Sequence, residues 1–289
     1  MTSRTALVFG ASGQIGAALL AALRAAGWEV LALSRLPRRQ MPGVRWLRGE
    51  FAQMPALPAP CDVVFSCGPL DRFAEWHVQS PGIAPRVVAF GSTSVHVKQG
   101  SADADERDVA RRLREAEAAV FATAARRGEA AVVLRPTLVY GAGRDATLTR
   151  IAALARRAGR FALPRSAHGL RQPVHVEDLA AAALAAAGRA EAAGRSYDLP
   201  GGEALPYREM VARVLASLSP SPPLHVLPDP LFRLLAVAAR GAGLARDLTD
   251  AVIARMRDDL VFDSAPAACD LGYAPRPFRP PPGTFDAPP

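Results

Sequence analysis

The sequence contains a single lysine, Lys98, and its remaining basic side chains are arginines. Only three cysteines occur, Cys61, Cys67 and Cys269, which is an odd number and too few for a disulfide framework. They predict free thiols in a reducing compartment and therefore a cytoplasmic protein. Because Cys-x-x-Cys motifs and cysteine–histidine clusters are missing, no metal site is expected.

Long uncharged apolar runs are also missing, so no transmembrane helix is predicted, and the N-terminus lacks the features of a secretory signal. The formal net charge of +8 raises the question of nucleic-acid binding. However, the arginines are spread over every segment, and aromatic residues, 6% of the chain, are not interleaved with them. We therefore expect no nucleic-acid partner and read the charge mainly as compositional bias, with a few arginines suited to a polyanionic cofactor or substrate.

Strand-like and helix-like patterns alternate over the first two hundred residues, which predicts an α/β fold with a doubly wound parallel (Rossmann) sheet. The expected strands cover residues 5–9, 29–33, 44–47, 62–66, 87–90, 131–134 and 196–199. The expected helices in this part cover residues 15–26, 104–127, 147–158 and 176–187.

After residue 200 the pattern changes to helices at 207–218, 231–242 and 248–257, separated by proline-rich breaks. We therefore predict a dinucleotide-binding domain over 1–200 and a smaller, mostly helical lobe over 201–289, interleaved from about residue 141. The tail from Pro275 is expected to wrap over a surface. The amphipathic helix at 231–242 is expected to cover a cleft or a partner surface, and a membrane-surface helix is the alternative.

Three glycines, Gly10, Gly13 and Gly16, follow the first strand directly and open an amphipathic helix. This spacing permits a tight turn, a close approach of backbone to phosphate, and close packing of helix on strand. The helix N-terminus then offers free N–H groups to a pyrophosphate. The pattern predicts a nicotinamide dinucleotide site, and an empty loop is the alternative. The other loop positions expected to contact the cofactor are Ser12, Gln14 and Ile15.

The end of the second strand favours NADP over NAD. An acidic side chain there would accept a hydrogen bond from the ribose 2′-hydroxyl of NAD, but this chain has Ser34 and Arg35. A guanidinium suits the 2′-phosphate of NADP, although Arg35 could instead stack on adenine or face solvent. Glu50, after the third strand, could accept from the adenine amino group or could face solvent.

Five further segments follow in a characteristic order and spacing: 87–94 (VVAFGSTS), 134–141 (LRPTLVYG), 170–179 (LRQPVHVEDL), 259–263 and 271–275. Together with the glycine loop they resemble the extended short-chain dehydrogenase/reductase superfamily, in its NAD-dependent epimerase/dehydratase-like branch. The resemblance covers nearly the whole chain. It implies a dinucleotide on the first lobe and, in many members, a nucleotide-linked sugar between the lobes. It also implies that Gly68 lies near the adenosine ribose or pyrophosphate, and Arg135 and Pro136 near the nicotinamide.

The same resemblance assigns the substrate side of the site. Ser92 or Thr93 would hydrogen-bond the reacting oxygen. Arg171 matches an arginine that can hold a substrate diphosphate, with a purely structural role as an equal alternative. For His175 and Asp178, at the start of a helix, a structural role is preferred.

The superfamily's usual acid–base pair, Tyr-x-x-x-Lys on the helix after strand five, is missing. No tyrosine precedes Lys98 by four positions, and the register against Glu117 puts the pair near Val109 and Leu113. A lysine one turn from a tyrosine lowers the tyrosine pKa and lets the phenol move a proton. Arginine cannot replace the tyrosine, because guanidinium does not deprotonate in proteins.

Three explanations of this absence stay open. His96, Lys98 or Tyr140 could do the proton work, the substrate could need little acid catalysis, or the protein could bind NADP without catalysis as a sensor or assembly module. We predict an NADP(H)-binding reductase or epimerase-like protein acting on a carbonyl or hydroxyl of a small metabolite. A nucleotide-linked sugar is the leading substrate class, and a homodimer is one expected assembly.

Overall fold

The computed structural model describes residues 4–51, 53–57, 60–145, 147–241 and 249–286. A seven-stranded sheet runs in the order β11-β6-β5-β4-β1-β2-β3, and all neighbouring strands are parallel. Its strands are β1 Thr5–Phe9, β2 Glu29–Ser34, β3 Val44–Arg48, β4 Val63–Ser66, β5 Arg86–Phe90, β6 Ala130–Pro136 and β11 Arg195–Leu199. The predicted doubly wound sheet is confirmed, and each expected strand forms within two residues of its expected bounds.

Helices cover both faces of this sheet. They are α1 Gln14–Ala25 and α6 Val176–Gly188 on one face and α2 Leu70–Gln79 and α4 Ala104–Arg127 on the other, with α3 Ser94–Val97 before α4 and α10 Ala265–Leu271 beside β11. Successive strand side chains point to opposite faces, so Ala6 and Val8 pack beneath α1 and α6, whereas Leu7 and Phe9 pack beneath α2 and α4. Helix α2 was not expected, because its short segment is largely polar; Phe73 carries its buried side.

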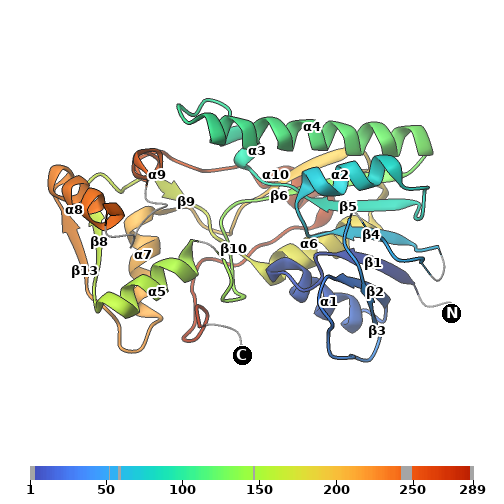
Figure 1. Cartoon of the computed structure of the whole chain (residues 1–289), viewed down its shortest axis with the longest axis horizontal. Coiled ribbons are helices and arrows are strands. Elements are labelled where there is room, and N and C mark those ends of the chain that lie inside the picture. Colours follow the sequence, from blue (N-terminus) through green and yellow to red (C-terminus); the bar gives the residue numbers. More distant parts are fainter. Residues whose placement is uncertain (1–3, 52, 58–59, 146, 242–248, 287–289) are drawn as a thin grey trace.

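A second group of elements lies at the other end of the long axis (Figure 1). Its helices are α5 Leu148–Ala158, α7 Tyr207–Ala216, α8 Asp229–Gly241 and α9 Asp250–Arg255, close to the expected ranges, although Ala242 and Leu248 lie outside the described residues. Its strands are β8 Phe161–Pro164 with β13 Leu224–Leu227, β9 Leu170–Arg171 with β12 Leu205–Pro206, and β7 Val139–Tyr140 with β10 Val174–His175.

A separate hydrophobic cluster fills this second group and includes Phe278 and Phe285 from the proline-rich tail. Both phenylalanines are at most 1% exposed, so the tail packs by its side chains although residues 272–286 contain neither helix nor strand. Strands β8 and β9 precede residue 200 but pair with β13 and β12, which follow it. The division into two domains at residue 200 stays a prediction. Every helix of the described chain is too short or too polar to cross a bilayer.

Candidate active site

A cavity of about 580 Å³ lies beyond the carboxyl ends of β1, β2, β3 and β4. This edge of a parallel sheet is where α/β proteins of this kind bind ligands. The structure brings to it seven of the residues expected to hold a cofactor, namely Gly10, Ser12, Gly13, Ser34, Arg35, Glu50 and Gly68. Residues that are distant in sequence therefore line one groove.

The glycine loop is built for close approach of backbone. Gly10 has a φ of 66°, and a Cβ added to it would lie 2.7 Å from the carbonyl carbon of Cys67. A Cβ at Gly16 would lie 2.1 Å from the Gly10 carbonyl oxygen, so the helix could not start so near the strand with any other residue. Helix α1 begins without a side-chain cap and without an acidic residue in its first turn.

These features fit a bound dinucleotide. Uncapped N–H groups and the positive end of α1 face the loop where a pyrophosphate would bind. Gln14 and Ile15 occupy the first turn, half-buried, and the Gln14 amide oxygen is buried with no hydrogen-bond partner among the described residues.

Arg35 is placed by a small hydrogen-bonded turn at the end of β2. The Ser34 hydroxyl donates to the Leu36 carbonyl at 2.8 Å and accepts from Arg38 Nε at 3.3 Å. Because Ser34 is held this way, the next residue, Arg35, lines the groove while remaining exposed. Glu50 lines the same groove after β3, so a cation and an anion are both available to the adenosine end of a cofactor.

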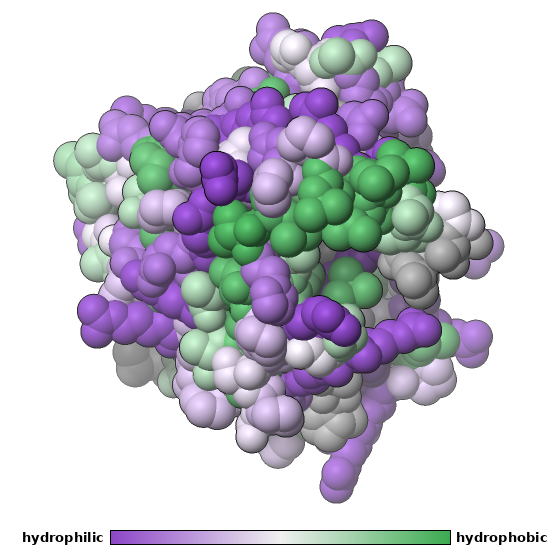
Figure 2. Space-filling model, turned by 90° about the vertical axis from the view of Figure 1, so that its left-hand side faces the viewer, coloured by the Kyte–Doolittle hydropathy of each residue, from purple (hydrophilic) through white to green (hydrophobic). Residues whose placement is uncertain are grey.

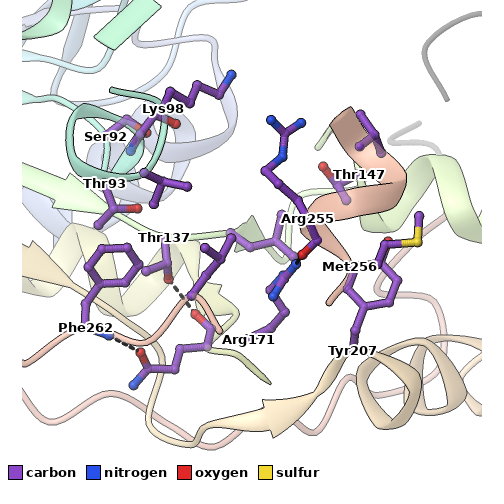
Figure 3. A pocket seen from close by; sticks show the side chains of 16 residues that line it. Ser92, Thr93, Lys98, Thr137, Thr147, Arg171, Tyr207, Arg255, Met256 and Phe262 are labelled. Atoms are coloured by element: carbon purple, nitrogen blue, oxygen red, sulfur yellow. Dashed lines mark hydrogen bonds between the residues drawn. The ribbon is translucent and has the colours of Figure 1, made fainter. Parts of the chain in front are cut away.

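A second cavity, of about 340 Å³, lies beyond the carboxyl end of β5. Figure 3 shows Ser92, Thr93 and Lys98 on its sheet side, with Tyr207 and Arg255 opposite them. Thr93 is 6% exposed, and its hydroxyl donates to the Pro136 carbonyl at 3.2 Å. Two hydroxyl-bearing residues and the lysine thus line one cavity. Its apolar lining is supplied by Val97, Leu138, Val252, Met256, Leu260 and Phe262.

His96 and Tyr140 are not among the residues that line this cavity. His96 Nε2 lies 3.1 Å from Asp198 Oδ1. Tyr140 is 2% exposed, with its ring edge-on to Phe278, and burial raises its pKa to about 12. Such a phenol is a poor proton donor near neutral pH. Of the three proton carriers considered from the sequence, Lys98 is the one that the structure places in the cavity. The catalytic roles of all three stay predictions.

Arg135 forms a nearly buried ion pair at the end of β6. Its Nε donates to Glu117 Oε1 of α4 at 2.9 Å, and its Nη1 lies 3.7 Å from Asp198 Oδ1. Burial alone would lower the pKa of Arg135, but the Glu117 carboxylate more than offsets this and raises it. The pair fixes α4 against β6, so α4 keeps a structural role although its positions 109 and 113 hold valine and leucine.

Arg171 is 7% exposed, and its guanidinium is occupied by backbone carbonyls. It donates to the carbonyls of Leu170 and Asp258, each at 2.7 Å, and to that of Arg255, while stacking over the Tyr207 ring. These bonds join β9 to the end of α9 and support the structural alternative. Although Arg171 lines the cavity, a substrate role for it stays a prediction.

His175 and Asp178 have the structural contacts that were preferred for them. The His175 ring accepts a hydrogen bond from the Glu177 N–H at 3.3 Å and so caps α6. The Asp178 carboxylate accepts from Arg276 Nε at 2.9 Å and thereby ties the tail to α6.

Sequence reasoning missed Tyr207 and Arg255, which line the cavity from α7 and α9. Arg255 pairs with Glu106 of α4, and Lys98 Nζ lies 3.9 Å from the same carboxylate. One carboxylate therefore pairs with two cations that line the cavity. Arg255 lies in the charge-rich stretch 255–258, directly before the segment 259–263 that contributes to the family resemblance. This position was the signal in the sequence that could have identified it.

The comparisons agree with this geometry. The sequence model of the NAD dependent epimerase/dehydratase family matches residues 6–81 and 108–199, more than half of the chain. The chain is 29% identical to the 2-alkyl-3-oxoalkanoate reductase of Stenotrophomonas maltophilia (strain K279a) over 314 residues, covering 93% of this chain and 94% of that one.

Two solved structures share the fold. MoeE5 in complex with UDP-glucuronic acid and NAD is 22% identical, with a TM-score of 0.68 and 94% of each chain covered. RMD from Pseudomonas aeruginosa complexed with NADPH is 17% identical, with a TM-score of 0.65, covering 95% of this chain and 94% of that one. The resemblance expected from the motifs is confirmed, and the chain belongs to the NAD dependent epimerase/dehydratase family.

Proposed function

We propose that this protein is an NADP(H)-dependent oxidoreductase that acts on a carbonyl or hydroxyl group of a small metabolite. The observation that carries the proposal is the placement of a dinucleotide-shaped groove and a cavity holding Ser92, Thr93 and Lys98 at the same edge of one sheet. A bound nicotinamide would supply the hydride that such a reaction needs. The loop from Gly10 to Gly16 would hold its pyrophosphate.

The groove supports NADP as the cofactor. Arg35 and Arg72 bring two guanidinium groups to it, and Glu50 is the one acid among its lining residues that the structure describes. A dianionic 2′-phosphate is therefore favoured over a hydroxyl. Because similar structures contain NAD in one case and NADPH in another, the choice rests on this chain's own residues.

The cavity supports a reaction without the usual tyrosine. The Ser92 hydroxyl, and the Thr93 hydroxyl once it leaves the Pro136 carbonyl, would donate a hydrogen bond to the reacting oxygen and orient it. Lys98, whose side chain is 28% exposed and 3.9 Å from Glu106, would place a cation near the same oxygen. An ammonium group stabilises a developing alkoxide and can deliver a proton to it as the carbonyl is reduced.

The apolar lining of the cavity favours a carbonyl substrate with an apolar arm. Val252, Met256, Leu260 and Phe262 would contact such an arm, and the similar protein from S. maltophilia is named for a 2-alkyl-3-oxoalkanoate. A nucleotide-linked sugar is the second candidate, because MoeE5 contains UDP-glucuronic acid. Arg171, which the family resemblance assigns to a substrate diphosphate, already donates to backbone carbonyls, which favours the first candidate.

The test is a steady-state assay of the purified full chain with NADPH or NADH. A 2-alkyl-3-oxo acid is offered with these reduced cofactors. UDP-glucose or UDP-glucuronic acid is offered in separate reactions with NADP+ or NAD+, in which both cofactor reduction and the epimerised sugar are measured. We expect NADPH oxidation with the oxo acid, and a loss of about ten- to a hundred-fold in kcat for Thr93→Val and for Lys98→Met. Tight NADPH binding without turnover of any substrate would instead favour the non-catalytic sensor or assembly module.

A further inference from the structure

Helix α8 has an apolar face that nothing in the described structure covers. Leu231, Leu234 and Leu235 are 44%, 66% and 49% exposed, and Ala238 is also exposed. These positions follow the i, i+3, i+4, i+7 spacing and so form one stripe, which we call the leucine stripe. Figure 2 looks at this end of the molecule and shows a continuous apolar patch bordered by hydrophilic residues.

The leucine stripe is separate from the face by which α8 is held in the fold. Phe232 and Ala236, 6% and 4% exposed, pack against Ile253 of α9. The helix is thus apolar on two sides, although one side suffices for its packing. Contiguous exposed apolar side chains on a soluble surface mark an interaction site.

A cationic groove runs beside the stripe, between α8 and α9. Its cavity of about 450 Å³ is lined by three guanidinium groups, those of Arg233, Arg240 and Arg257, and by one carboxylate, that of Asp250. Asp250 lies 3.2 Å from Arg240, and Asp229 of α8 lies 3.0 Å from Arg257. Among the residues that the structure describes here, three cations face two anions.

We propose that the leucine stripe and this groove dock the protein on the surface of an anionic lipid bilayer. Leucines on one side of a helix and arginines on the next are the arrangement of helices that lie in a membrane interface. The leucines would enter the apolar edge of the bilayer, while the exposed Arg233 would reach the lipid phosphates.

The charge and the shape favour a bilayer over a second copy of the chain. In a two-fold dimer through the leucine stripe, the two arginine grooves would lie close together and repel each other. Helix α8 is also at the end of the molecule's long axis (Figure 1). A helix at this extremity can contact a deformable lipid surface without a matching groove in a partner.

Docking at α8 would also bring the substrate cavity near the membrane. Ile253 of α9 packs under α8, while its neighbours Val252 and Met256 line the cavity. Substrates with alkyl chains, which the bilayer concentrates, would then be close to the apolar lining. This consequence rests on the proposed function, whereas docking itself does not and is measured without any substrate.

The test is co-sedimentation of the full chain with vesicles. We expect binding to vesicles of phosphatidylcholine mixed with phosphatidylglycerol, weaker binding to phosphatidylcholine alone, and loss of binding as salt is raised. Leu234→Glu and Leu235→Glu each lower the partition coefficient by about ten-fold or more. Arg233→Glu lowers binding to the anionic vesicles selectively. Val78→Glu makes the same type of change at a 45% exposed position on α2 and leaves binding intact.

Several outcomes would overturn the proposal. The wild-type chain failing to bind anionic vesicles at low salt would do so without any variant, and so would Leu234→Glu binding as well as Val78→Glu. Analytical ultracentrifugation tests whether a second copy of the chain covers the leucine stripe instead. A wild-type dimer that Leu234→Glu dissociates, together with no vesicle binding, would assign the stripe to self-association. Because docking is measured without turnover, a failed activity assay does not affect it.

Discussion

Replacing Arg35 by aspartate should change the cofactor preference of the groove from NADP to NAD. Arg35 is exposed, so its charge-assisted contact with a 2′-phosphate is worth only about 1.5 kcal/mol. A carboxylate in its place adds a repulsion of about 1 kcal/mol at a water-like dielectric constant. The total of about 2.5 kcal/mol weakens NADP binding by roughly 60-fold. The new carboxylate can accept from the 2′-hydroxyl of NAD, worth about 1 kcal/mol, so NAD binding tightens by roughly five-fold.

The assay is titration of NADPH and NADH, followed by the fluorescence of the nicotinamide, for the wild-type chain and Arg35→Asp. Arg160→Asp is the matched control, because it makes the same charge change at an exposed site outside the groove. The control should reduce both affinities slightly and equally, through the net charge alone. If Arg35→Asp behaves like Arg160→Asp, Arg35 does not contact the 2′-phosphate and the preference for NADP is wrong.

Three further changes test other parts of the structure. Gly16→Ala puts a methyl group 2.1 Å from the Gly10 carbonyl oxygen and should lower the affinities for NADPH and NADH by about ten-fold or more. Gly188→Ala, with open space around the new methyl, is its control, and equal affinities in the two variants would refute the close-packing argument. Glu117→Ala leaves its nearly buried arginine partner without its main counter-charge and should cost about 3 kcal/mol in urea unfolding, whereas a cost below about 1 kcal/mol would mean that the pair is dispensable. The pKa of His175 lies below 6.5 in the folded chain, because of burial and then the nearby Arg276 charge, so the unfolded chain binds the proton more readily. The contribution of His175 to the free energy of unfolding should therefore be fully present above pH 6.5. It should decline as the pH falls from 6.5 toward the pKa of His175 in the folded chain. His175→Asn keeps an acceptor at the start of α6 and should reduce that slope, as urea unfolding at several pH values would measure.

The sheet could be predicted because its strands are short apolar runs buried on both faces, and because glycine marks the turn into α1. The same reasoning missed β8 and β13. Their pairing joins segments about sixty residues apart, which local patterning cannot show. It also missed α2, because only one side of that helix is buried and most of its other positions are polar. Periodicity identifies elements with a strong repeat and loses those that tertiary contacts define.

The groove could be predicted in more detail than the cavity, for a physical reason. Its residues follow strand ends, and parallel strands bring their carboxyl ends to one edge whatever the loops do. The direction of a loop side chain has no such constraint. Lys98 turns into the cavity, whereas His96, two residues earlier, turns to Asp198. Arg255 ends α9, and its carbonyl accepts from Arg171 of β9, a contact with no local signal in the sequence.

The absent acid–base pair is best understood from what α4 keeps. Glu117 still holds Arg135 at the end of β6, so the helix occupies its place without carrying the tyrosine or the lysine. A second acid of α4, Glu106, contacts both Lys98 and Arg255, which line the cavity. Burial works against the ionised form of Glu106, but the Ser101 hydroxyl and Arg255 outweigh it, so its pKa is lowered and it stays charged near neutral pH. An ionised Glu106 therefore holds Lys98 and Arg255 close to each other at the wall of the cavity. Lys98 comes a few residues after Ser92 and Thr93, whose hydroxyl-bearing side chains line the same cavity. Under the proposed function, Lys98 and Arg255 would supply the positive charge that a lysine on α4 would supply in the usual pair, and Lys98 would also deliver the proton.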